Sequence, residues 1–65
     1  MHGYTNRQMQ NLIDDHVHSE RDRYILKRHF IDNITFERLG EELGLSDRWV
    51  RKIAKRWETE LRKHL

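Results

Sequence analysis

The feature that most constrains the fold of this chain is the stretch 35–55, TFERLGEELGLSDRWVRKIAK, which contains two glycines four residues apart. Gly40 falls inside a helical pattern, where a residue without a side chain lets a second helix approach closely. Gly44 ends that pattern, because glycine adopts the left-handed backbone conformation that stops a helix. Ser46 then supplies an N-cap hydroxyl for another helix. The stretch therefore predicts two short helices joined by a tight turn, a helix-turn-helix.

The second helix of this pattern has a basic face and an apolar face. At about 100° per residue, its basic side chains fall within roughly one third of the circumference, and its apolar side chains gather on the opposite side. The apolar face is suited to burial and the basic face to contact with phosphate, with an ordinary solvated face as the alternative interpretation. The basic residues are Arg48, Arg51, Lys52 and Lys55, and the apolar residues are Val50, Ile53, Ala54, Trp57 and Leu61.

Positive charge is concentrated in the C-terminal third of the chain. Residues 46–65 contain seven Lys and Arg against three Asp and Glu, a net charge of +4, whereas residues 1–45 contain six against eight, a net charge of −2. The formal net charge of the whole chain is only +2. A basic element on a slightly acidic body orients a protein toward DNA. We therefore expect double-stranded DNA to be the partner of the basic face.

Length and composition exclude several classes of protein. Sixty-five residues with 35% hydrophobic content can form one modest core but no substrate cavity, so we expect a single domain over residues 1–65 and no enzyme. The chain has no cysteine for a disulfide or a thiolate zinc site. No stretch approaches the roughly twenty apolar residues of a membrane span, and the first residues lack the apolar middle of a signal peptide. We expect no membrane association and a cytoplasmic location.

The apolar spacing and the absence of proline predict an all-α fold. Thr5 and Gln8 have the form of a capping box for the first helix. Ser19 is the N-cap candidate of the second helix, which residues 32–33 end, and Thr35 caps the third. We expect a four-helix domain with helices over about residues 6–17, 20–31, 36–43 and 47–64.

The last predicted helix is long for a DNA-recognition helix alone. Its final turns place Trp57 and Leu61 on the apolar side, where they can pack against the first two helices or against a second copy of the protein. Trp49 lies at the border between the apolar and basic faces. Three roles remain open for it: a flank of the core, a phosphate contact through its indole N–H, or part of a dimer patch.

Residues 25–63, ILKRHFIDNITFERLGEELGLSDRWVRKIAKRWETELRK, resemble the fourth conserved region of bacterial sigma factors, the domain that binds the upstream promoter element. The most specific part is IDNITFERLGEELGLS, followed by an Arg- and Lys-rich helix that ends in LRK. The resemblance implies a helix-turn-helix domain that binds DNA. A free-standing domain of this size also resembles small phage or mobile-element transcription regulators, which implies a homodimer on a palindromic operator. The same resemblance implies that the cytoplasm is that of a bacterial cell or an infected bacterial host.

The start of the recognition helix departs from the family pattern. In the family this segment commonly reads Thr-Arg-Glu-Arg-Val-Arg-Gln-Ile, and its Arg, Glu and Gln contact bases. Here Ser46 keeps the cap, and the fold implied by the resemblance is retained, but the promoter preference does not carry over. Asp47 stands at the first Arg, Arg48 at the Glu, Trp49 at the next Arg and Lys52 at the Gln, while Arg51 keeps a basic position.

These observations predict a sequence-specific transcription regulator with helix 47–64 in the major groove. Arg48 and Lys52 are the best candidates for guanine O6 and N7, and Asp47 is a candidate acceptor from cytosine N4 or a carboxylate that stabilises the helix dipole. Arg51 is a candidate for base contact or for phosphate. The base-contact candidates are Asp47, Arg48, Arg51 and Lys52, and the phosphate-contact candidates are Thr35, Ser46, Trp49, Lys55 and Arg56.

The rival hypothesis is a protein-interaction module that mimics sigma region 4 and binds RNA polymerase or an anti-sigma factor. The resemblance implies that such partners use an apolar groove near the first helices. Four residues at helical spacing could line such a groove, although residues at this spacing are ordinarily core. They are Met9, Ile13, Val17 and Phe30.

The five histidines do not form a metal-binding pattern. His16 and His18 diverge by about 200° on a helix, whereas a helical metal pair is normally four residues apart. Neither His29 nor His64 has a nucleophile or a carboxylate at a motif spacing. We therefore expect no metal and no cofactor, and we interpret the histidines as surface or core-edge residues.

Overall fold

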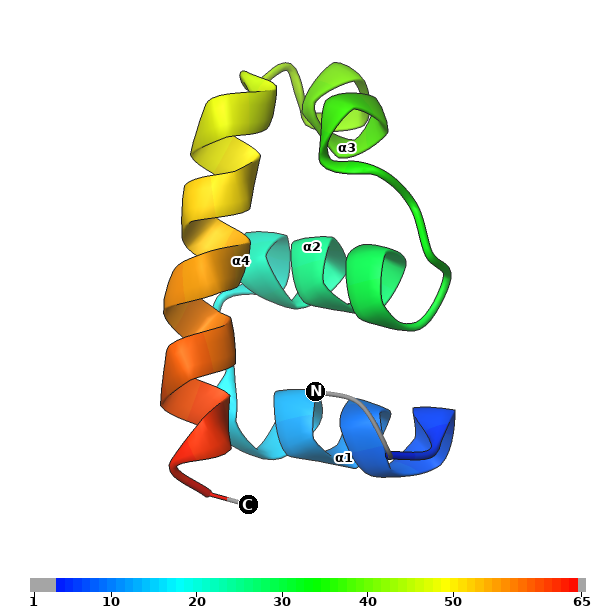
Figure 1. Cartoon of the computed structure of the whole chain (residues 1–65), viewed down its shortest axis with the longest axis vertical. Helices are drawn as coiled ribbons and strands as arrows, with labels where there is room; N and C mark the ends of the chain where they lie inside the picture. Colours follow the sequence, from blue (N-terminus) through cyan, green and yellow to red (C-terminus); the bar gives the residue numbers. More distant parts are fainter. Residues whose placement is uncertain (1–3, 65) are drawn as a thin grey trace.

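The chain folds into four α-helices and no strands over residues 4–64, which are the residues that this computed structural model describes (Figure 1). The all-α prediction is confirmed. The predicted helices start at the observed residues, but three of them end one or two residues earlier than predicted. The helices are α1 (Asn6–His16), α2 (Glu20–Phe30), α3 (Phe36–Leu43) and α4 (Asp47–Arg62).

A hydroxyl side chain caps the N-terminus of every helix. The Thr5 hydroxyl accepts from the Gln8 backbone N–H, and the Gln8 side chain accepts from the Thr5 N–H, which confirms the capping box. Ser19, Thr35 and Ser46 each accept from a backbone N–H three residues later. Because each cap satisfies donors that the helix itself leaves free, the start of each helix is fixed locally.

The end of α1 differs from the prediction at Val17. This residue was expected in the helix, but its backbone is extended (φ −106°, ψ 111°), and its side chain is fully buried. The Arg23 side chain of α2 donates from Nε to the Val17 carbonyl oxygen at 2.7 Å. Burial of Val17 and this hydrogen bond stabilise the extended backbone, so α1 stops at His16.

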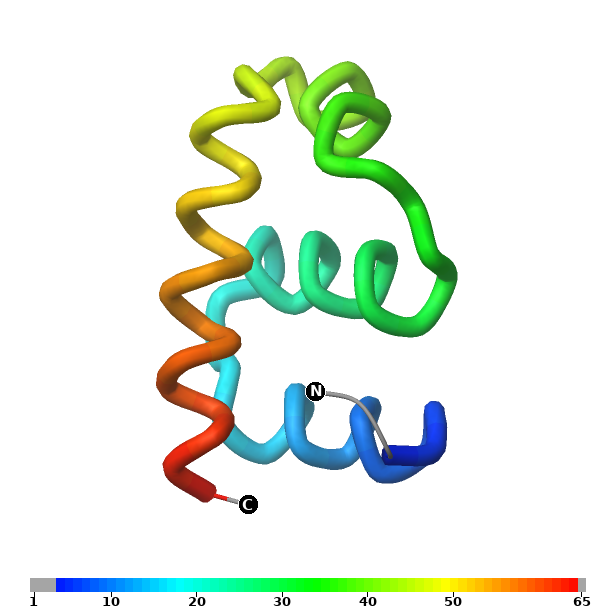
Figure 2. Tube along the Cα trace, in the orientation of Figure 1, coloured from blue at the N-terminus to red at the C-terminus, as the bar shows by residue number. Residues whose placement is uncertain are grey.

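The long helix α4 is the element on which the other three are arranged. In Figures 1 and 2, α1 lies beside the C-terminal half of α4, the N-terminal end of α2 lies at its middle and α3 lies at its N-terminal end. Within residues 4–64, α1 packs against α2 and α4, and α3 packs against α2 and α4, but α1 and α3 do not meet. Helices α2 and α4 therefore each pack against the three other helices and link α1 to α3.

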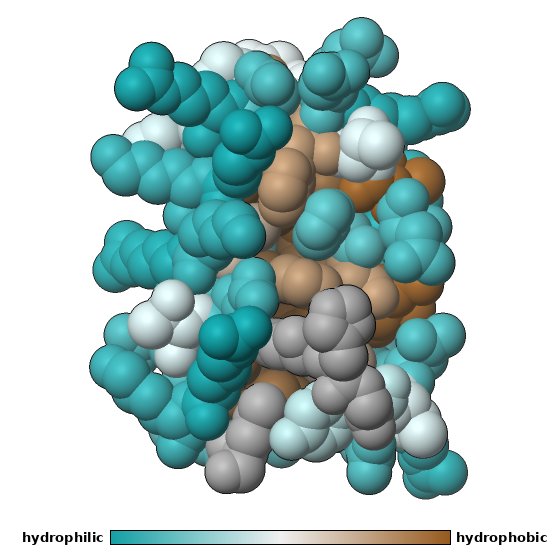
Figure 3. All heavy atoms as spheres, in the orientation of Figure 1, coloured by the Kyte–Doolittle hydropathy of each residue, from teal (hydrophilic) through white to brown (hydrophobic). Residues whose placement is uncertain are grey.

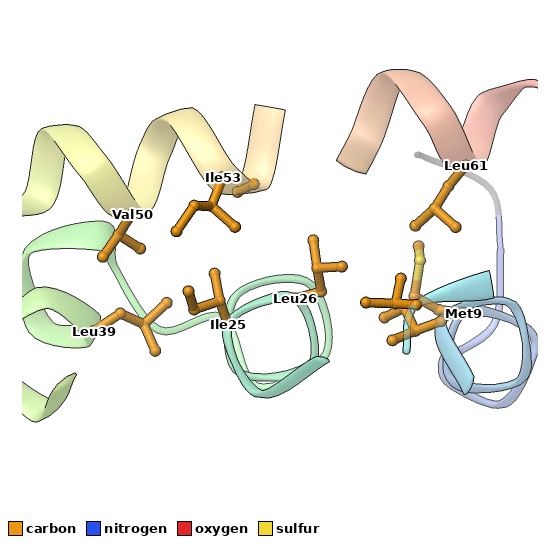
Figure 4. Close-up of a cluster of buried hydrophobic side chains, with 10 residues drawn as sticks. Met9, Ile25, Leu26, Leu39, Val50, Ile53 and Leu61 are labelled. Atoms are coloured by element: carbon orange, nitrogen blue, oxygen red, sulfur yellow. The ribbon is translucent and has the colours of Figure 1, made fainter. Parts of the chain in front are cut away.

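One continuous apolar core runs along the inner face of α4 (Figure 4). Leu39 and Val50 lie at the α3 end of the cluster, and Met9 and Leu61 lie at the α1 end. Leu61 is fully buried, so the long last helix packs against helices of its own chain. This is the first of the two interpretations given above, the other being packing against a second copy of the protein. The buried residues are Met9, Ile13, Val17, Ile25, Leu26, Leu39, Val50, Ile53, Ala54 and Leu61.

Burial decides between the two interpretations of the apolar residues of the first two helices, ordinary core or open groove. Met9, Ile13 and Val17 have at most 5% of their surface exposed, and Phe30 is partly buried against the same cluster. These side chains form the core rather than an open groove. Of the residues that the structure describes, no helix is long and apolar enough to cross a membrane.

Candidate nucleic-acid interface

The turn between α3 and α4 is determined by close contact between backbones. Gly44 has φ 69° and ψ 29°, the left-handed conformation predicted for it, and the Leu45 N–H donates to the Gly40 carbonyl oxygen at 2.8 Å. A Cβ atom on Gly40 would lie 2.5 Å from the Leu45 carbonyl oxygen and 3.2 Å from the Asp47 nitrogen. Only glycine at this position permits the observed approach of α3 to the start of α4.

The outer face of α4 carries the predicted basic side chains. Arg48, Arg51, Lys52 and Lys55 are all exposed, while Val50 and Ala54 on the opposite side are buried. Hydrophilic side chains project along the α4 side of the molecule in Figure 3. The helix therefore presents a basic surface that the core of the domain does not use.

One flank of this surface is a stack of side chains from three helices. The Arg51 guanidinium lies over the Phe36 ring, 5.8 Å from its centroid, and the Phe36 ring stacks on the His29 ring with centroids 4.0 Å apart. His29 Nδ1 lies 2.8 Å from the Ile34 carbonyl oxygen. Thr35 lines the same depression as Arg51. The structure thus brings together two candidates that are sixteen residues apart in the sequence.

The opposite flank is a notch between α4 and the N-terminal turn of α2. It has a volume of about 160 Å³, and its walls include both tryptophans of the chain. The Trp57 indole Nε1–H donates to the Asp22 carboxylate at 2.7 Å, which ties α4 to α2 at this point. The notch is lined by Arg21, Asp22, Trp49, Lys52, Ile53, Arg56 and Trp57.

Arg21 is the residue of this surface that the sequence analysis missed. It lies in the first turn of α2, yet it lines the same notch as Lys52 and Arg56 of α4. Its side chain is half exposed, and its Nε donates to Asp22 at 3.1 Å. No local sequence pattern predicts that Arg21 belongs to this surface, because only the packing of the first turn of α2 beside α4 brings it to the basic face.

Asp47 has an acidic environment. Glu37 and Glu41 of α3 line one shallow hollow together with Asp47, next to Gly40 and Gly44. Asp47 is exposed and lies in the first turn of α4, where a carboxylate interacts favourably with the helix dipole. The N-terminal tip of α4 is consequently acidic, and the basic surface begins one residue later, at Arg48.

An ion-pair network holds α3 against α2 behind this surface. Arg28 donates from Nη2 to both carboxylate oxygens of Glu42 at 2.9 and 3.0 Å, and the Tyr24 hydroxyl donates to the same carboxylate. The Arg28 hydrogen bond, with a smaller contribution from its charge, lowers the pKa of Glu42 below its ordinary value. The Arg28 pKa is raised in return, chiefly by its hydrogen bond to Glu42. Arg28 is thereby engaged within the domain.

The capping hydroxyls keep one hydrogen-bonding function free. Thr35 and Ser46 accept from the Arg38 and Trp49 backbone N–H groups, at 3.2 Å each. A hydroxyl that accepts in this way still has its own O–H to donate. Both side chains are exposed, so each O–H can be directed at an external acceptor.

Comparison with known protein families assigns this architecture. The family "Sigma-70, region 4" matches residues 19–63, from the N-cap of α2 to the residue after α4. The chain belongs to the sigma-70 region 4 family. This family is a helix-turn-helix DNA-binding regulatory family and not a family of enzymes. The match leaves α1 outside, and a search of curated proteins and one of solved structures found no match.

Proposed function

We propose that this region 4 domain is a sequence-specific transcription regulator that inserts α4 into the major groove of double-stranded DNA. One observation carries the proposal: the exposed basic face belongs to the second helix of a helix-turn-helix in a family that binds DNA. If the basic face of α4 were an ordinary solvated face, there would be no reason for it to lie on the second helix of a helix-turn-helix. In this motif the second helix enters the groove and its N-terminal residues contact base edges.

Base recognition falls to the exposed side chains in the first turns of α4. Arg48 and Lys52 donate to guanine O6 and N7, which is the commonest specific contact in the major groove. Asp47 accepts from cytosine N4, and the neighbouring carboxylates of α3 keep phosphate away from this tip. Arg51 contributes a further base contact or a phosphate contact from its position over Phe36.

The two flanks of α4 hold the two strands that border the groove. On one side the Thr35 hydroxyl and the N-terminus of α3 face phosphate beside Arg51. On the other side Arg56 contacts phosphate together with Arg21, which lines the same notch. Ser46 and Lys55 complete the phosphate contacts. These contacts fix the orientation of α4, and the base contacts supply specificity.

A single recognition helix makes few base contacts, so the regulator acts as a homodimer on a palindromic operator in the cytoplasm. Two half-sites about one helical turn apart place both copies on one face of the duplex. This stand-alone mode of action is that of small phage or mobile-element regulators. The family assignment supports the DNA-binding step, and the dimer is a further part of the proposal.

Selection from random duplex DNA at physiological salt tests the proposal, with a mass determination in solution alongside. The expected result is a palindromic site and a dimeric mass. Salt-labile binding without any motif would overturn sequence-specific regulation. It would favour the rival function, a mimic of sigma region 4 that docks on RNA polymerase or an anti-sigma factor.

Two variants separate base contact from phosphate contact on the selected site. Arg48→Ala is expected to relax the preference at one base pair of each half-site. Lys55→Ala is expected to weaken all duplexes about equally and to lower the slope of log affinity against log salt by about one. Both side chains are exposed, so neither variant should change the melting temperature. A lower melting temperature without a binding effect in both would contradict this use of the face.

A further inference from the structure

We propose that Trp49 recognises the 5-methyl group of a thymine next to the base that Lys52 contacts. This inference rests on the proposed function and assigns a specificity-determining role to the indole ring. It differs from the expectation that Trp49 contacts phosphate through its N–H. The ring face, rather than the N–H group, makes the contact.

Trp49 is an exposed aromatic residue at the place where a recognition helix meets bases. Its side chain lies in the first turn of α4, and 44% of its surface is exposed. The Ser46 hydroxyl accepts from its backbone N–H at 3.2 Å, so the backbone that carries the ring is held by the N-cap. Nearly half of the Trp49 surface is therefore left exposed beside the basic residues of α4.

The cations around Trp49 determine what the ring can contact. The Lys52 ammonium lies over the Trp49 ring, 6.0 Å from its centroid, and Arg56 lines the same notch as both residues. Negatively charged phosphate is attracted to these two side chains before it is attracted to an indole. Because the Lys52 ammonium lies over one face of the ring, the part of the ring that Lys52 leaves exposed is available to an apolar group.

The notch beside Trp49 also has apolar walls. Ile53 and Trp57 line it. The Trp57 N–H already donates to the Asp22 carboxylate, so Trp57 presents the carbon atoms of its ring to a ligand and no free hydrogen-bond donor. The exposed apolar group on base edges in the major groove is the thymine methyl. A methyl group packed against the Trp49 ring loses contact with water on one side and is stabilised by the hydrophobic effect.

The geometry also limits where the thymine lies. Trp49 and Lys52 are three residues apart on α4, a spacing that makes them neighbours on the helix surface. Their contacts consequently fall on adjacent base pairs. The selected half-site should contain a thymine next to the guanine that Lys52 contacts.

Removal of single methyl groups from the operator tests this inference. Starting from the selected duplex, each thymine is replaced in turn by deoxyuridine, which deletes the methyl and keeps the base pairing. At one position of each half-site, the replacement should lower the affinity of the wild-type chain about fourfold, which is the change expected from the loss of one buried methyl group. Trp49→Ala should bind the thymine and uracil duplexes equally, because the surface that senses the methyl is gone.

Lys52→Ala is the matched control. It should bind all duplexes more weakly and keep the same ratio of thymine to uracil affinity, since the ring is retained. Trp49→Phe should keep part of the ratio. Circular dichroism checks that each variant is folded.

The outcomes distinguish this inference from the function on which it rests. If wild type recovers an operator but no uracil substitution matters, or if Trp49→Ala keeps the wild-type ratio, the methyl contact is wrong and the regulator stands. If wild type selects no operator at all, both are overturned.

Discussion

The two ends of α4 are joined to the rest of the domain in different ways. At the N-terminal end, α3 approaches so closely that Gly40 faces the Leu45 carbonyl oxygen across a gap with no room for a Cβ atom. At the C-terminal end, Leu61 packs against apolar side chains such as Met9 of α1 (Figure 4). Backbone contact fixes the orientation of the first region, and side-chain burial stabilises the second. The helix-turn-helix end therefore sets the geometry of the DNA surface, while the α1 end contributes mainly stability.

The sharpest way to break this comparison is to add one methyl group at each glycine of the turn. Gly40→Ala should lower the free energy of unfolding by about 3 kcal/mol and abolish DNA binding, because α3 must move away from α4. Gly44→Ala should cost only about 1 kcal/mol, since its Cβ meets nothing within 4 Å and the penalty is confined to its positive φ. Urea unfolding of both variants measures the difference. Equal losses of unfolding free energy in the two variants would mean that the close approach of α3 does not constrain the N-terminal end of α4.

A cavity at the opposite end should affect stability and not geometry. Leu61→Ala is expected to lower the free energy of unfolding by about 2–3 kcal/mol, because the fully buried side chain is lost near the end of α4 where the site can partly collapse. Urea titration measures this loss. At low temperature, where the variant remains folded, its affinity for the selected operator should equal that of wild type. A loss of affinity in the folded variant would show that the two ends are coupled.

The hydrogen bond between Trp57 and Asp22 lies between the two regions and should have an intermediate effect. Trp57→Phe removes the donor and keeps an aromatic ring, so the free energy of unfolding should fall by about 1 kcal/mol. Asp22→Asn keeps an acceptor oxygen and should cost less. Thermal unfolding of the two variants gives the comparison. An Asp22→Asn variant less stable than Trp57→Phe would indicate that the carboxylate charge, and not the hydrogen bond, holds α2 to α4.

The smallest expected effect is the acid sensitivity of the α2–α3 contact. The pKa of Glu42 is lowered in the folded chain, so its contribution is present above its ordinary value of 4.5 and is lost as the pH falls through the folded value. Glu42→Gln should therefore flatten the decline in stability below about pH 4.5. Chemical unfolding at pH 7 and at pH 3 measures the slope, with the exposed Glu41→Gln as the matched control. An unchanged slope in Glu42→Gln would mean that the ion pair between Arg28 and Glu42 does not contribute to the acid sensitivity of the domain.

The sequence was sufficient for the features that depend on neighbouring residues. Each helix start was predicted at the observed residue because the Ser or Thr directly before the helix caps it. The positive φ of Gly44 was predicted because this glycine ends α3. Features that depend on distant residues were not predicted. The extended backbone of Val17 depends on Arg23 six residues away, and Arg21 reaches the basic surface only because the first turn of α2 packs beside α4.

The candidate site divides in the same way. The basic face of α4 follows from helical periodicity, so its four cations were predictable. The stack of Arg51 on Phe36 and His29 joins three helices, and no periodicity within one helix indicates it. Base and phosphate roles within the face stay predictions until a complex with DNA is measured.

The most direct test of the central claim is amide chemical-shift mapping of the ¹⁵N-labelled chain titrated with the selected duplex. If α4 enters the major groove, the largest changes should fall on residues 46–56 and on Thr35 and Arg21, while the amides of α1 stay close to their free positions. A result in which the changes concentrate on α1 and the outer side of α2, with the exposed face of α4 unaffected, would contradict this mode of binding. The helix-turn-helix would then be a scaffold for a different surface.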